Sequence, residues 1–313
     1  MRRRGFPVAQ ALAVAALVLG LALPAMTPAR ACDVRRLAWV PVRLQAGHPL
    51  VRARLDGRVA WFVLDTGAER TLLTPDAVRR LGLRLDPWVG TTTIGIGGTE
   101  RHANAVARSL TLAGVALRQA RLAGGLSLSV GAIPAGRVGG VVVDGVLGRD
   151  LLARFDLALD FPAARVGLYR VRGCAGRFLP WSVPYGGVGS LPGYRAMLGI
   201  PVRADGVVLR AMIDTGSTGS LVSGAGMARL GWSVAGLAGA PAVRARGVGR
   251  RVVVMRYAHL REMRVAGVAA REVPVVAAPV ILTPLLDLLV GMQWLSGHLV
   301  WLSYATGQVF VAR

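Results

Sequence analysis

The tripeptide Asp-Thr-Gly occurs twice in this sequence, at residues 65–67 and again at residues 214–216. Each copy follows a mostly apolar run with the composition of a buried β-strand, at 61–64 and at 209–213, the second interrupted by Arg210. A single copy is explained by turn formation alone, because Asp and Gly both favour turns. Two copies at equivalent places in a repeated chain predict that the carboxylates of Asp65 and Asp214 face one another.

Two carboxylates in contact share a proton, because ionising both in one site is unfavourable. The ionised member can take a proton from water while the protonated member polarises a carbonyl group, and the water then attacks the carbonyl carbon. This chemistry is amide hydrolysis, and it needs no metal, no other cofactor and no covalent intermediate. Gly67 and Gly216 let the backbone approach the carboxylates, and Thr66 and Thr215 can hydrogen-bond across the axis between the two turns.

The elements that must position these turns also recur, so the chain contains one structural unit twice. Both turns are followed by a short helix pattern that ends at a glycine, Gly82 or Gly231. Further on, residues 144–148 correspond to residues 287–291, and we interpret the aspartates that open these two segments, Asp144 and Asp287, as turn caps. We predict helices at 75–81, 149–153, 224–230 and 292–295, and paired strands at 155–161 with 166–169 and at 299–304 with 308–311.

The remaining sequence alternates short strand patterns with Gly-rich turns, which predicts a mostly β protein with a few short helices. A polar segment rich in Gly and Pro at 173–192 separates the two repeats. At about 150 residues per domain, the length also suits two units. We therefore predict an N-terminal lobe at 32–172 and a C-terminal lobe at 193–313, joined by 173–192.

Composition excludes several classes of function. Apolar residues make up 53% of the chain and charged residues 17%, which is typical of a folded protein. The formal charge is +22 and every basic residue is Arg. These arginines are scattered, whereas a nucleic-acid-binding protein gathers them in a stripe or tail, so we expect no nucleic-acid partner. The four histidines lack the spacing of metal ligands, so no metal site is expected. We assign them to surface or packing roles; they are His48, His102, His259 and His298.

The N-terminus has the pattern of a secretory signal peptide. Three arginines at 2–4 precede an apolar run from Val8 to about Met26, and residues 29–31 supply the Ala-x-Ala site of signal peptidase. We predict that residues 1–31 are removed and that the mature chain is periplasmic or secreted, by the general or the twin-arginine route. An uncleaved membrane anchor is the alternative, because the run is nearly long enough to span a bilayer. We expect no membrane span in the mature chain.

Cys32 and Cys174 are the only cysteines. In an exported protein an even pair allows one disulfide, and we expect it to tie the start of the mature chain to its middle. Two alternatives remain open, namely unpaired thiols and lipidation of Cys32. The residues before Cys32 lack the Leu that typically precedes a lipidated cysteine by three positions.

These motifs resemble those of the retropepsin and pepsin clan of aspartic peptidases, over nearly all of residues 40–313. Residues 65–73 together with Gly-Arg-Asp-Leu-Leu at 148–152 are similar to the retroviral-type pattern, whereas Asp-Thr-Gly-Ser at 214–217 is the pepsin-like form. The resemblance implies a bilobal, pepsin-like fold of two β-barrel-like halves related by a pseudo-twofold axis. It also implies that Asp65 and Asp214 are the catalytic pair.

The same resemblance implies further roles for named residues. It predicts an ion pair between Glu69 and Arg149 in the first half, which uncharged residues replace in the second half, where Ser217 follows the catalytic turn. In this family a β-hairpin flap closes over the substrate. The flap candidates are Ile96, Gly97 and Gly98 in the first half, and Gly247, Val248 and Gly249 in the second, although a Gly-rich hairpin tip can also be an ordinary turn.

Together these features predict an exported aspartic endopeptidase that acts on peptides or proteins as a monomer with an internal pseudo-dimer. Two alternatives use the same fold without catalysis. One is a cleft that binds peptides without cutting them, and the other is an envelope scaffold whose basic surface contacts anionic lipid or polymer. The intact Asp-Thr-Gly in both halves favours the peptidase.

Overall fold

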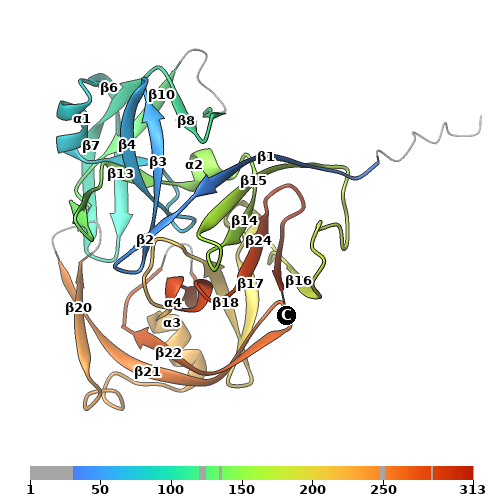
Figure 1. Ribbon diagram of the computed structural model, residues 1–313. Helices are drawn as coiled ribbons and strands as arrows, with labels where there is room; N and C mark the ends of the chain where they lie inside the picture. Colours follow the sequence, from blue (N-terminus) through green and yellow to red (C-terminus); the bar gives the residue numbers. More distant parts are fainter. Residues whose placement is uncertain (1–30, 120–124, 134–135, 247–250, 283–284, 313) are drawn as a thin grey trace, which may run out of the picture. The chain divides into compact units, whose positions relative to one another are not determined.

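Figure 1 shows the computed structural model of the chain, which describes residues 31–119, 125–133, 136–246, 251–282 and 285–312. Most of these residues belong to β-strands joined by short turns, and the four α-helices among them are short. The predicted mostly β fold is confirmed, and the strands form barrel-like sheets in two halves. The predicted signal peptide lies outside the described residues apart from Ala31.

The first half contains a sheet whose central strands position Asp65. In that centre, β13 (Gly145–Leu147) runs parallel to β4 (Arg58–Leu64) and antiparallel to β5 (Leu72–Leu73), so the end of β4 lies inside the sheet. A separate two-stranded ribbon consists of β11 (Arg137–Val138) and β12 (Val141–Val142). In sheet order the strands are β6 (Arg84–Gly95), β7 (Gly98–Ala107), β10 (Leu126–Val130), β5 (Leu72–Leu73), β13 (Gly145–Leu147), β4 (Arg58–Leu64), β3 (His48–Leu55), β8 (Leu110–Leu112) and β9 (Val115–Leu117), with β2 (Arg43–Gln45) paired to β3.

The second half repeats this central arrangement in a seven-stranded sheet. Here β23 (Leu288–Val290) runs parallel to β18 (Val207–Ile213) and antiparallel to β19 (Leu221–Val222), as β13 does to β4 and β5. The repeat in the sequence is therefore a repeat of backbone topology. In sheet order the strands are β17 (Ile200–Ala204), β18 (Val207–Ile213), β23 (Leu288–Val290), β19 (Leu221–Val222), β22 (Val268–Ala277), β21 (Val252–Val265) and β20 (Ala242–Arg246).

A six-stranded sheet combines strands from both predicted lobes. Strand β14 (Asp156–Asp160) of the first lobe pairs antiparallel with β24 (Leu299–Ser303) of the second, with Leu157 opposite Leu302. The two lobes are thus joined by main-chain hydrogen bonds as well as by the segment 173–192. In sheet order the strands are β1 (Asp33–Pro41), β15 (Arg165–Arg172), β14 (Asp156–Asp160), β24 (Leu299–Ser303), β25 (Gln308–Ala312) and β16 (Tyr185–Gly189).

The four predicted helices are all present, with boundaries within one residue of those expected. The Thr74 hydroxyl accepts a hydrogen bond from the N–H of Ala77 at the start of α1, and the Ser223 hydroxyl does the same for Gly226 in α3. Helix α3 ends at Gly231, whose φ of 71° is the left-handed value that glycine allows. The helices are α1 (Pro75–Arg80), α2 (Arg149–Leu152), α3 (Gly224–Leu230) and α4 (Met292–Leu295), with a 3₁₀ turn at Arg195–Met197.

Aromatic side chains pack against the six-stranded sheet. Trp301 on β24 is fully buried, with its ring centroid 4.4 Å from that of Tyr169 and 6.1 Å from that of Trp181 in the joining segment. The structure also contains the predicted disulfide between Cys32 and Cys174, which ties the residue before β1 to the segment after β15. The joining segment and the start of β1 are thus both held against this sheet.

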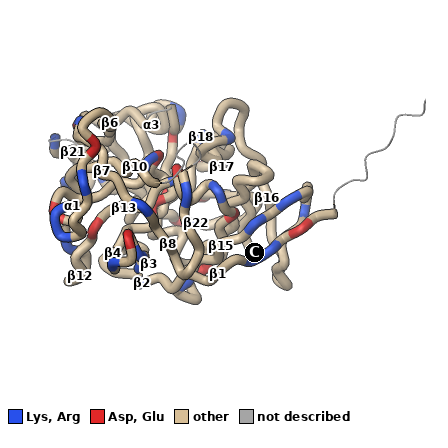
Figure 2. The backbone as a smooth tube through the Cα atoms, turned by 90° about the horizontal axis from the view of Figure 1, so that it is seen from above, with Lys and Arg blue, Asp and Glu red and all other residues tan. Residues whose placement is uncertain are grey.

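Charged positions are spread over the backbone. Figure 2 shows Arg positions on strands of both halves, from β1 to β21, with acidic positions between them. None of the helices in the described part of the chain is long and apolar enough to cross a membrane.

Candidate active site

The two Asp-Thr-Gly turns meet at the ends of β4 and β18. The N–H of Asp65 donates to the carbonyl of Leu147 (3.0 Å), and the N–H of Asp214 donates to the carbonyl of Val290 (3.0 Å). The turns are so close that a methyl group on Gly67 would overlap the Asp214 carboxylate, and one on Gly216 would overlap that of Asp65. Each glycine therefore makes room for the opposite aspartate.

Thr66 and Thr215 form a reciprocal set of hydrogen bonds across the two turns. The N–H of Thr66 donates to the Thr215 hydroxyl (3.0 Å), and the N–H of Thr215 donates to the Thr66 hydroxyl (3.1 Å). Each hydroxyl then donates to a carbonyl of the opposite strand, Ile213 or Leu64, at 2.7 Å. Both side chains are buried, so four bonds in a dry environment fix the relative position of the turns.

The start of a short helix supports each turn from behind. In the first half the N–H of Arg149 donates to the carbonyl of Ala68 (2.9 Å), and in the second the N–H of Met292 donates to that of Ser217 (2.8 Å). The glycine before each helix, Gly148 or Gly291, lies against the backbone of the same turn with no space for a Cβ. These contacts explain why the second motif of each repeat is rich in glycine.

The carboxylates of Asp65 and Asp214 have unequal surroundings. One oxygen of Asp65 accepts hydrogen bonds from the N–H groups of Gly67 (2.9 Å) and Ala68 (2.8 Å). Asp214, which is 9% exposed, accepts one from Gly216 (2.9 Å). The Ser217 hydroxyl donates to the carbonyl of Gly219 (2.7 Å) instead of to the carboxylate. The ionised form is thus better stabilised on Asp65 than on Asp214.

Burial raises the pKa of Asp65 above its ordinary value, although its backbone hydrogen bonds oppose the rise. Burial also raises the pKa of Asp214, and the negative charge of Asp65 raises it further. The pair consequently holds a proton at pH values where two separate carboxyl groups would both be ionised.

The predicted ion pair between Glu69 and Arg149 does not form, so that expectation is corrected. Arg149 donates instead to the carbonyl of Ala196 (3.0 Å), because its guanidinium turns toward the 3₁₀ turn of the second half. The carboxylate that secures this loop belongs to Asp150, which accepts from the N–H (2.8 Å) and the hydroxyl (2.7 Å) of Thr71. Thr71 lies in the loop that follows the first Asp-Thr-Gly.

His48 lies close enough to the pair for the charge of Asp65 to act on it, which the sequence analysis missed. Burial lowers the pKa of His48, and the negative charge of Asp65 opposes that change. Its Nδ1 is buried without a hydrogen-bond partner. The neighbouring Gly47 lies against Thr218 of the second Asp-Thr-Gly loop, at a distance that would place an added Cβ 3.2 Å from the threonine methyl. Only the fold joins these segments.

The first flap candidate forms the tip of the hairpin between β6 and β7. Ile96 and Gly97 are the turn residues, since Gly95 pairs with Gly98. The carbonyl of Gly97 accepts a hydrogen bond from the N–H of Arg251 (2.9 Å), and Ile96 packs against an apolar cluster of the second half. This tip therefore contacts both halves. The second candidate, Gly247, Val248 and Gly249, lies outside the described residues, between β20 and β21.

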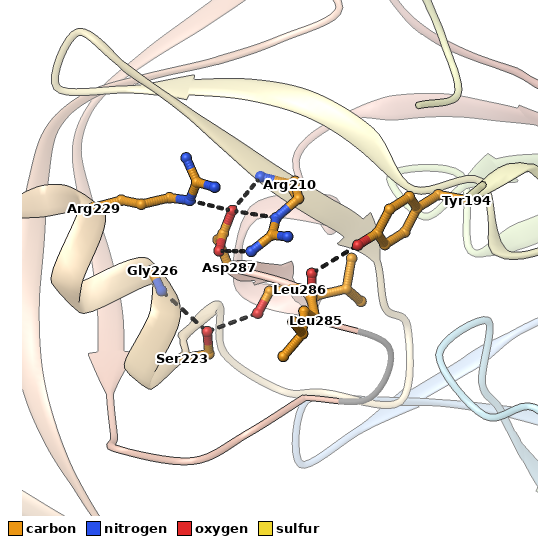
Figure 3. A network of polar contacts seen from close by, with 8 residues as sticks. All are labelled: Tyr194, Arg210, Ser223, Gly226, Arg229, Leu285, Leu286 and Asp287. Atoms are coloured by element: carbon orange, nitrogen blue, oxygen red, sulfur yellow. Dashed lines mark hydrogen bonds and ion pairs between the residues drawn. The ribbon is translucent and has the colours of Figure 1, made fainter. Parts of the chain in front are cut away.

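Asp144 and Asp287 do more than cap turns. Asp144 accepts from the backbone N–H of Trp61 (2.9 Å), and Asp287 accepts from that of Arg210 (2.8 Å). Both carboxylates are buried, and each pairs with an arginine near the end of a helix. Those arginines, Arg80 and Arg229, occupy equivalent positions in the repeat. This equivalence was the feature of the sequence from which the Arg–Asp pairing could have been predicted. Figure 3 shows the second-half network.

Comparison with known proteins agrees with this geometry. The chain matches the aspartyl protease family over residues 51–151 and 200–294, which is more than half of its length and covers both repeats. It belongs to that family. The matching solved structures include an aspartic proteinase from Irpex lacteus, with 12% identity and a TM-score of 0.53 over 90% of this chain and 97% of that one. The fold is thus pepsin-like, and family and fold together support a peptidase. No curated protein sequence matches the chain.

Proposed function

We propose that the mature chain is an exported aspartic endopeptidase with Asp65 and Asp214 as its catalytic pair. The observation that carries this proposal is the crosswise contact of the two turns, in which each glycine lies against the opposite carboxylate. A lone carboxylate cannot act as acid and base in the same step, whereas a pair that shares one proton can.

In the proposed reaction Asp65 is the base and Asp214 the acid, because the hydrogen bonds at Asp65 favour its ionised form. Asp65 removes a proton from water, the oxygen bonds to the scissile carbonyl carbon, and Asp214 gives its proton to the carbonyl oxygen. Asp65 then protonates the amide nitrogen while Asp214 takes back a hydroxyl proton. The C–N bond breaks, and both carboxyl groups return to their starting states.

The other site residues support this chemistry indirectly. Thr66, Gly67, Thr215 and Gly216 set the separation of the carboxylates, and Ser217 stabilises the second loop. The β6–β7 tip acts as a flap. To admit a peptide, it must break the hydrogen bond between the Arg251 N–H and the Gly97 carbonyl.

The test is cleavage of a mixed peptide library by residues 32–313 between pH 3 and 8, with and without a pepstatin-type inhibitor. The matched control is the double variant Asp65→Asn/Asp214→Asn, checked by circular dichroism for an unchanged fold. We expect internal cleavage by the wild type and none by the variant. An intact library with folded wild-type protein would contradict the proposal, and peptide binding by the same proteins would then be measured.

Export is proposed from the N-terminal pattern and is supported by the disulfide, since such bonds persist in oxidising compartments. Expression of the full chain followed by N-terminal sequencing of the periplasmic fraction tests it. A mature N-terminus at Cys32 is expected, and a full-length chain retained in the membrane fraction would favour an anchor.

A further inference from the structure

The first half has a hollow of about 480 Å³ beside the Asp144 carboxylate. Its walls are mostly apolar, with valine methyl groups and an indole ring, and its polar groups are the Arg80–Asp144 pair. Val59 and Val142 at its rim are 39% and 42% exposed. The lining residues are Val59, Trp61, Arg80, Val141, Val142 and Asp144.

The internal repeat supplies the equivalent place in the second half. Val59 and Trp61 stand six and four residues before Asp65, as Val208 and Arg210 do before Asp214. In the same way Arg80 corresponds to Arg229, Val142 to Leu285, and Asp144 to Asp287. The backbone agrees, because the N–H of Asp144 donates to the carbonyl of Trp61 and that of Asp287 to the carbonyl of Arg210, both at 2.8 Å.

In the second half this place is filled by side chains of the protein itself. The Arg210 guanidinium donates to both oxygens of Asp287, at 3.0 and 2.9 Å. Beside it, the hydroxyl of Tyr194 donates to the carbonyl of Leu285 at 3.1 Å. Figure 3 shows Tyr194 beside Arg210, with its hydroxyl directed at the Leu285 carbonyl. A tyrosine from the start of the second lobe, at the position that Gln45 has in the first, thus completes the packing.

The first half lacks both fillers. Trp61 replaces Arg210, so Asp144 keeps the backbone hydrogen bond and the pairing with Arg80 but receives no second guanidinium. The residues that line the hollow include no counterpart of Tyr194. Valine and indole surfaces suit an aromatic ring. The Asp144 carboxylate is buried and already accepts from Trp61 and Arg80, and the half-exposed Arg80 guanidinium can donate to the oxygen of a phenol.

We propose that this hollow binds the side chain of a tyrosine on a polypeptide partner, at the place equivalent to the one where the second half packs its own Tyr194. Trp61 lies four residues before Asp65 on β4, so the site is about 13 Å along the strand from the catalytic pair, at about 3.3 Å per residue. A protein substrate that presents a tyrosine several residues from its cleaved bond fits this spacing. Binding itself does not depend on catalysis.

The first experiment titrates p-cresol and N-acetyl-tyrosinamide into ¹⁵N-labelled residues 32–313 and follows the indole N–H of Trp61. We expect a saturable shift of that signal with both probes, and a much smaller one with cyclohexanol, which lacks the aromatic ring. No shift with either phenol, or an equal shift with cyclohexanol, would overturn the proposal.

Variants then locate the site by ligand-observed NMR with N-acetyl-tyrosinamide. Trp61→Arg introduces the second-half residue, whose guanidinium can occupy Asp144, and Val142→Arg covers the hollow from its exposed rim without touching the core. Both should weaken binding at least tenfold. Trp88→Arg is the control, because Trp88 is 91% exposed on β6 and does not line the hollow. Unchanged binding in folded Val142→Arg would place the probe elsewhere.

Discussion

The two aspartates differ in residue-level detail although their turns are alike. Asp65 accepts two backbone hydrogen bonds and Asp214 one, while Asp65 is the negative charge that acts on Asp214. The shared proton therefore belongs on Asp214 in the resting site. This asymmetry follows from Ala68 and Ser217, whose N–H groups are placed differently in the two loops.

Asp214→Asn should abolish cleavage and make the fold more stable at neutral pH. Burial raises the pKa of Asp214 in the folded state, so the stability that this group contributes is present below its unfolded pKa of about 3.9 and is lost as pH rises. A neutral amide avoids that loss. Thermal unfolding should show that the variant has a free energy of unfolding about 1 to 3 kcal/mol higher than the wild type at pH 7. This difference should shrink toward pH 3. A gap independent of pH would contradict this prediction.

His48→Gln should move the acid limb of kcat/KM to higher pH. Protonated His48 lowers the pKa of Asp65, and the base must be ionised to accept a proton from water. Removing the imidazole therefore makes Asp65 harder to ionise. The measurement is a pH–rate profile with a single peptide, and His259→Gln, at an exposed position on β21, is the matched control. Identical profiles for all three proteins would show that His48 has no such influence.

At the scale of elements, hydrogen bonds between loops hold the site together. The threonine bonds join the two turns to each other, and the starts of α2 and α4 join each turn to its own half. These are main-chain contacts or contacts of buried hydroxyls, so they tolerate few substitutions.

Thr66→Val should lower the free energy of unfolding by about 2 to 4 kcal/mol, because it leaves the Thr215 N–H and the Ile213 carbonyl buried without partners. Thr66→Ser retains the hydroxyl and should recover most of that loss. Urea denaturation of the three proteins checks this expectation. A serine variant no more stable than the valine variant would contradict the expectation that the hydroxyl contributes more to stability than the methyl group.

Asp150→Ala should cost about 2 kcal/mol of stability, since the N–H and hydroxyl of Thr71 lose their acceptor. By contrast, Glu69→Gln should change stability by less than about 0.5 kcal/mol, because Glu69 is exposed. The same denaturation assay compares them. A larger loss of stability from Glu69→Gln than from Asp150→Ala would instead support the Glu69–Arg149 ion pair that the family resemblance implied.

For the whole molecule, the six-stranded sheet and the disulfide connect distant parts of the chain. Strands β14 and β24 bring both halves into one sheet, and the bond between Cys32 and Cys174 closes a loop across 142 positions of sequence. The disulfide constrains the unfolded chain, and the shared sheet couples the two halves. Unfolding should therefore be cooperative across both halves.

Cys32→Ser/Cys174→Ser should lower the free energy of unfolding by about 2 to 4 kcal/mol, because the unfolded chain regains the freedom that the long loop had lost. Chemical denaturation with and without dithiothreitol measures it. The reductant should destabilise the wild type by a similar amount and leave the variant unaffected. No effect of reductant on the wild type would show that the bond is absent in solution.

The sequence alone determined the repeat, the four short helices and the two aspartates. These depend on neighbouring residues: an apolar strand before Asp-Thr-Gly, Thr74 or Ser223 as a helix cap, and a glycine where a helix ends. The pairing of Cys32 with Cys174 was predictable because no other cysteine competes.

Tertiary structure decided which distant side chains meet. Asp150 rather than Glu69 secures the first loop, His48 lies within reach of the charge on Asp65, and Tyr194 fills a space that stays open beside Trp61. None of these contacts leaves a local pattern, because each joins segments whose spacing in the sequence carries no information about their distance in space. Only the packing of the strands determines that distance.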